Sequence, residues 1–107
     1  MEFYKLVRVK MGLRRIILDV LKPIRNPGIE DLALELENLP GVDGVNITVK
    51  EIDVETLTLT IVIEGESINF KLVKEKLEEN GAVIHSVDQV IAGKRMVEIP
   101  YVYLETQ

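Results

Sequence analysis

Cysteine is absent from this chain of 107 residues, and so are long basic runs and long apolar runs. Without cysteine, the chain has no disulfide, no thiolate zinc site and no cysteine nucleophile. Its apolar runs are far shorter than the roughly 20 residues that cross a bilayer. With no secretory leader in the sequence, we expect a cytoplasmic protein with no membrane partner. The net charge of −5 argues against a nucleic acid partner.

The apolar residues that are present, 47% of the chain, are enough for one core and follow two periods. Alternation predicts strands over residues 13–22, 45–53, 57–63 and 82–92. Helical spacing predicts one helix that begins at Pro27, with Asn26 as its N-cap, and ends near Leu39. A second helix is predicted over residues 69–80 and ends at the Asn-Gly pair.

This order, β-α-β-β-α-β, predicts an α+β fold of the ferredoxin-like type. In that fold a four-stranded antiparallel sheet carries both helices on one face, with the first and third strands in the centre. We expect a single domain over residues 1–107 with a core at about 13–93. The terminal extensions, 1–11 and 94–107, have strand-like composition.

The opposite face of the predicted sheet has no helix to cover it. Alternation assigns to it a mixture of apolar and polar side chains: Arg15, Ile17, Asp19 and Leu21 of the first strand, and Thr58, Thr60, Val62 and Glu64 of the third. A single chain would expose these aliphatic side chains to water. We therefore expect another subunit, or the ends of the chain, to cover this face.

The last predicted strand carries the only histidine, His85, close to Ser86 and Asp88. Neither of the two alternating sets of side chains in this strand is wholly apolar, and a bulge near Ser86 would explain why. Either His85 or the pair Ser86 and Asp88 then faces the same side as Asp19 of the neighbouring strand. Carboxylates with one imidazole suit a hard divalent cation, so Asp19, His85 and Asp88 are candidate ligands of Mg²⁺ or Ca²⁺. The alternative is a hydrogen-bonded structural histidine beside an edge aspartate.

Two further clusters are candidate binding sites. Glu51, Asp53 and Glu55 surround the predicted hairpin turn, where Glu51 and Asp53 are candidate cation ligands; the alternative is an acidic tip that keeps the hairpin soluble. Lys22 and Arg25 precede the first helix, whose amino end attracts anions, so they are candidates for an anion or a small metabolite.

No enzymatic activity is predicted. The loop after the first strand lacks the glycine-rich run of acylphosphatases, which use the same fold. Successive strand residues point to opposite faces, so His85, Ser86 and Asp88 do not form a hydrolase triad. The central strands also lack the aromatic residues with which an RNA-recognition module stacks bases.

Three segments, RRIILDVLKP, GVDGVNITVKEID and IHSVDQVIAGKRMVE, together resemble the small archaeal proteins of domain-of-unknown-function family 211. The resemblance covers residues 13 to about 98. It implies a ferredoxin-like fold, a ring-like homo-oligomer and bound divalent ions, and it assigns no activity and no catalytic residue. Asp19, His85 and Asp88 lie within the similar segments.

These patterns favour a non-enzymatic, homo-oligomeric binding or regulatory protein that holds Mg²⁺ or Ca²⁺ through carboxylates. One alternative is a sensor of small metabolites or anions, similar to amino-acid-binding ACT domains, with its ligand near Lys22 and Arg25. The other is a purely structural interaction protein.

Overall fold

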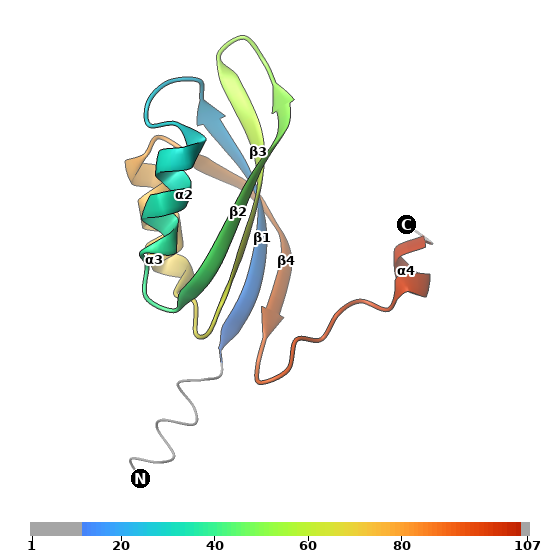
Figure 1. The fold of residues 1–107 in the computed structure, drawn as a ribbon. Coiled ribbons are helices and arrows are strands. Elements are labelled where there is room, and N and C mark those ends of the chain that lie inside the picture. Colours follow the sequence, from blue (N-terminus) through green and yellow to red (C-terminus); the bar gives the residue numbers. More distant parts are fainter. Residues whose placement is uncertain (1–11, 106–107) are drawn as a thin grey trace.

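The computed structural model describes residues 12–105 and has the predicted ferredoxin-like topology. One antiparallel sheet has the order β2-β3-β1-β4, and two helices lie together on one of its faces (Figure 1). The elements of this domain are β1 (Leu13–Pro23), α2 (Ile29–Glu37), β2 (Val42–Ile52), β3 (Thr56–Gly65), α3 (Phe70–Glu79) and β4 (Val83–Ala92). The prediction of the fold class is confirmed.

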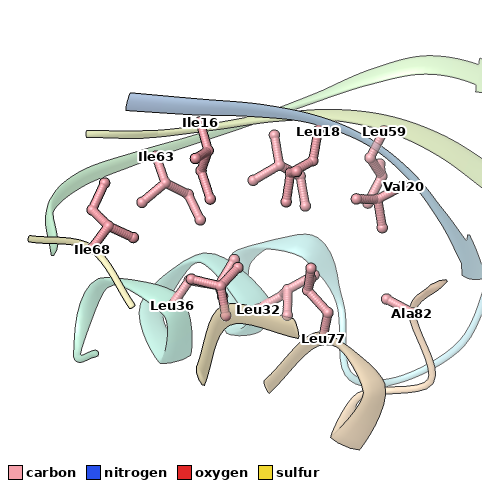
Figure 2. Packing of buried hydrophobic residues seen from close by; sticks show 12 residues of the cluster. Ile16, Leu18, Val20, Leu32, Leu36, Leu59, Ile63, Ile68, Leu77 and Ala82 are labelled. Carbon is pink, nitrogen blue, oxygen red and sulfur yellow. The ribbon is translucent and has the colours of Figure 1, made fainter. Parts of the chain in front are cut away.

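The core lies between the two central strands and the helices (Figure 2). Because side chains alternate along a strand, every second residue of β1 and β3 points to the helices and is buried. Helical spacing gives α2 and α3 one buried stripe each. The fully buried residues that meet there are Ile16, Leu18 and Val20 of β1, Leu59, Ile61 and Ile63 of β3, Leu32 and Leu36 of α2, and Val73 and Leu77 of α3.

The helix boundaries follow from their end residues. The Asn69 side chain accepts a hydrogen bond of 3.2 Å from the Leu72 amide and so caps α3. This helix ends before Gly81, whose φ of +75° suits glycine. The predicted start of the first helix is wrong: Gly28, and not Asn26, is the N-cap of α2, because the first helical hydrogen bond runs from the Leu32 amide to the Gly28 carbonyl.

The prediction of a strand-like carboxyl-terminal extension is wrong for the described residues. After β4, residues 94–100 form no strand, and a short helix follows as α4 (Tyr101–Glu105). No described strand pairs with this segment through backbone hydrogen bonds, and the Pro100 carbonyl accepts one from the Tyr103 amide inside the helical turn. The predicted extension at residues 1–11 lies outside the described residues. Among the described helices, none combines the length and the apolar character needed to span a membrane.

Candidate functional site

The face of the sheet opposite α2 and α3, hereafter the open face, carries rows of side chains that cross all four strands. Strand pairing defines the middle of this face, because Asp19 of β1 lies opposite Thr60 of β3 and opposite Ser86 of β4. Thr60 in turn lies opposite Thr48 of β2. The central row therefore has three hydroxyl side chains and one carboxylate, in the order Thr48, Thr60, Asp19, Ser86.

Aliphatic side chains flank the central row on both sides. Ile17 lies opposite Val62 on one side, and Leu21 lies opposite Thr58 on the other. Leu21 is exposed, while Ile17 and Val62 are half-buried. This confirms the predicted assignment of faces in β1 and β3, and it leaves a mixed apolar and polar surface that neither α2 nor α3 covers.

Two register shifts in β4 decide how its polar residues are arranged. The first leaves Asp88 and the second leaves His85 as an extra residue without a partner on β1. The predicted bulge near Ser86 is thereby confirmed. Ser86 pairs with Asp19, and its hydroxyl donates a hydrogen bond of 2.7 Å to the Asp88 carboxylate. Of the two predicted arrangements, the structure thus has Ser86 and Asp88 next to Asp19.

Asp19 has an unsatisfied oxygen. Its Oδ1 atom is buried and has no hydrogen-bond partner among the described residues. Buried polar atoms in folded proteins are nearly always paired, because an unpaired one has lost its water without replacement. The central row therefore presents a carboxylate oxygen that no described group satisfies.

The described residues of one chain do not by themselves assemble a complete set of metal ligands. Within residues 12–105 no group of three or more histidine, aspartate or glutamate side chains converges. The Asp19 and Asp88 carboxylates and the Ser86 and Thr60 hydroxyls are hard oxygen donors of the kind that Mg²⁺ and Ca²⁺ prefer. A cation there would complete its shell with water or with a second copy. His85 stays a predicted ligand, on an exposed bulge.

The acidic residues of the β2–β3 hairpin have different structural roles. The Asp53 carboxylate accepts a hydrogen bond of 2.7 Å from the Val54 amide, and the Asp53 amide donates to the Thr56 carbonyl at 2.8 Å. These two bonds close the turn. Glu51 lies opposite Thr58 after a further register shift, and Glu55 is exposed. Their use as cation ligands stays a prediction.

Lys22 has a structural task in the loop that follows β1. Its side chain is 1% exposed, and its ammonium group donates hydrogen bonds to the backbone carbonyls of Pro23 (3.1 Å) and Arg25 (2.8 Å). Burial lowers the pKa of Lys22 and the charge of Arg25 lowers it further, while Glu30 acts in the opposite direction. Of the predicted anion-binding pair, only Arg25 is exposed to a ligand.

Sequence reasoning missed the part that Arg15 plays on the open face. Its guanidinium group forms ion pairs with Glu64 of β3 at 2.7 Å and with Glu98 of the carboxyl-terminal segment at 2.8 Å. Its hydrogen bonds to Glu98 and then to Glu64 raise its pKa. Strand alternation could have indicated the Arg15–Glu64 ion pair, because the two residues lie opposite each other on one face of the sheet. No local pattern points to Glu98, which is 83 positions away in the chain.

Comparisons with known proteins place the chain among uncharacterized relatives. The model of domain-of-unknown-function family 211, described as an uncharacterized ArCR family, matches residues 14–106. An uncharacterized protein of Methanocaldococcus jannaschii is 51% identical over 87 residues, which cover 81% of this chain and 89% of that protein. Neither description states an activity or a ligand.

Proposed function

The chain belongs to domain-of-unknown-function family 211, and from this premise we propose that it is a non-enzymatic, self-assembling binding protein whose open face holds a divalent cation at Asp19. The observation that carries the proposal is the buried Asp19 Oδ1 atom, which has no partner among the described residues. A second copy and a cation on the open face would satisfy the carboxylate and cover the aliphatic side chains beside it.

Self-assembly is supported by the composition of the open face. Ile17, Leu21 and Val62 surround a polar centre, as in protein interfaces where apolar area and a few directed polar groups occur together. Binding of Mg²⁺ or Ca²⁺ is supported by the ligand types, because the central row and Asp88 offer only oxygen donors.

A non-enzymatic role is supported by the polar contacts of β4. The Ser86 hydroxyl donates a hydrogen bond to Asp88. It is therefore not hydrogen-bonded to the imidazole of His85, as a nucleophilic triad requires. His85 and Asp88 are both bulge residues on the edge strand β4, and both are exposed to water.

Two single lysine variants test the interface, one on the open face and one on the helical side of the domain. Wild-type protein should elute from a sizing column with a light-scattering mass well above 12.1 kDa. Ile17→Lys introduces a charge into the open face and should lower this mass toward one chain. Leu34→Lys, at an exposed position of α2, is the matched control and should leave the mass unchanged. An unchanged mass for Ile17→Lys would rule out the open face as the interface.

A second candidate function, a sensor of small metabolites or anions, is supported by a cleft beside Arg25. This cleft has a volume of about 500 Å³ and is lined by Pro23, Ile24, Arg25, Val54, Glu55 and Thr56. The guanidinium group of Arg25 gives this cleft a positive charge, and the carboxylate of Glu55 gives it a negative charge. Thermal-shift screening with amino acids and nucleotides tests this candidate: a stabilising compound should lose its effect on the Arg25→Ala variant.

A further inference from the structure

The carboxyl-terminal segment after β4, residues 94–103, hereafter the arm, turns away from the sheet and leads to α4 outside the domain (Figure 1). Several apolar side chains along the arm are exposed to water. Val97 is 63% exposed, and Ile99, Tyr101 and Val102 are also exposed. Helix α4 has only five residues, too short to be stable without packing against something else.

The base of the arm is attached firmly to its own domain. Arg14 donates hydrogen bonds to the carbonyls of Gly65 (2.8 Å), Gly93 (3.3 Å) and Lys94 (3.1 Å). Arg15 holds the arm again through its ion pair with Glu98 at 2.8 Å. These contacts fix where the arm leaves the sheet, while the apolar residues beyond Glu98 stay exposed.

The β2–β3 hairpin exposes a second apolar surface at the opposite end of the sheet (Figure 1). Val54 at its tip is 90% exposed, and Ile52 is 73% exposed. The tip is also acidic, because Glu51, Asp53 and Glu55 alternate with these two residues. The arm has the opposite charge at its base, where Lys94 and Arg95 are both exposed.

The arm is too short to reach the hairpin tip of its own chain. Arg15, where Glu98 is anchored, precedes Pro23 by eight strand residues, a distance of about 26 Å. Pro23 lies opposite Thr56, and the tip extends beyond this pair. From Glu98 to Val102 an extended chain spans only about 14 Å. A contact between the two surfaces therefore needs two molecules.

We propose that the arm of one copy packs against the β2–β3 hairpin tip of a second copy, with Lys94 and Arg95 facing Glu51 and Glu55. Two apolar surfaces are buried together, and two oppositely charged surfaces are paired. The contact joins different surfaces of the two copies, so it is head-to-tail and closes a ring where the rotation between copies allows. This inference rests on the self-assembly proposed above and adds a second contact to the open face.

Charge reversal tests the polar half of this contact. Lys94→Glu with Arg95→Glu should weaken association by tenfold or more, as should Glu51→Lys with Glu55→Lys. A chain with all four substitutions should recover wild-type association, because the charges are exchanged and remain complementary. Lys71→Glu with Lys74→Glu on the exposed side of α3 changes the net charge as the arm reversal does, and it should leave association unchanged.

Cross-linking tests the apolar half, since the chain has no cysteine of its own. A mixture of Val54→Cys and Val97→Cys chains, one carrying a size tag, should form mixed disulfide-linked dimers faster than like pairs under mild oxidation. A wild-type chain that stays monomeric would overturn self-assembly and this contact together. An assembled wild-type protein with neither charge rescue nor mixed dimers would overturn only the arm contact.

Discussion

Replacing Asp19 by asparagine should have opposite effects on stability in the absence and in the presence of a divalent cation. The Asp19 Oδ1 atom is buried without a partner among the described residues. In a single chain without metal, this carboxylate oxygen is therefore buried without a hydrogen bond. Asparagine has almost the same shape and no charge, so Asp19→Asn keeps a polar atom at this position but removes the part of the penalty that is due to charge.

The size of the effect follows from the burial of the residue. An unsatisfied buried polar group costs about 1–3 kcal/mol and a charged one costs more; we take about 1 kcal/mol for the difference between carboxylate and amide, because Asp19 as a whole is only partly buried. Unfolding a chain of 107 residues has an entropy of about 0.22 kcal/mol per kelvin, so 1 kcal/mol corresponds to about 4 °C in melting temperature. Asp19→Asn should thus melt about 4 °C above wild type in EDTA.

The sign should reverse when Mg²⁺ or Ca²⁺ is added. A cation at about 100 times its dissociation constant stabilises the folded state by about 2.7 kcal/mol, or about 12 °C in this chain. Wild type should show this rise, and Asp19→Asn should show little of it because it has lost the charged ligand. The assay is a thermal melt followed by circular dichroism, at a concentration where light scattering reports a single chain.

Asp43→Asn is the matched control, because it removes one carboxylate from an exposed position of β2. Its stability should stay within about 0.5 kcal/mol of wild type in both buffers. Two results would refute the reasoning. Asp19→Asn that melts below wild type in EDTA would mean that the carboxylate already has a partner, and an equal response of both proteins to the cation would mean that the ion binds elsewhere.

Three further outcomes are expected. Leu36→Ala removes a fully buried side chain and should cost about 2–5 kcal/mol, measured by urea unfolding; a smaller loss would mean that the core refills the space. Because burial lowers the pKa of Lys22 on folding below its ordinary value of 10.5, the unfolded chain binds more protons between the two pKa values, and stability gains from a rise in pH through that window. The stability difference between wild type and Lys22→Met should therefore shift toward wild type as the pH rises toward 10.5, and parallel curves would exclude this titration. Arg15→Met releases the arm and should speed tryptic cleavage at Lys94 and Arg95, with a loss of less than about 1 kcal/mol in domain stability; equal digestion rates would mean that the ion pair does not hold the arm.

Local patterns predicted the fold because they agree with one another along the chain. The alternation of Ile16, Leu18 and Val20 requires one buried strand face, and the spacing of Leu32 and Leu36 requires one buried helix stripe. The order of the elements then allows few topologies. The same alternation accounts for the burial of Lys22, because this residue lies on the same side of β1 as Val20, the side that faces the helices.

The features that sequence reasoning missed or left open depend on partners far away in the chain. The pairing of Ser86 with Asp19 depends on where β4 shifts its register against β1, and neither strand contains this information alone. The strand-like composition of residues 96–104 did not produce a strand, since no described strand pairs with them. The contact between Arg15 and Glu98 joins residues 83 positions apart.

The mass of the full chain in solution is the most direct test of self-assembly through the open face. Light scattering across a dilution series should give a multiple of 12.1 kDa that decreases toward one chain only at low concentration, and Ile17→Lys should make this decrease occur at higher concentration. A constant mass of 12.1 kDa at every concentration, with and without Mg²⁺ or Ca²⁺, would contradict it.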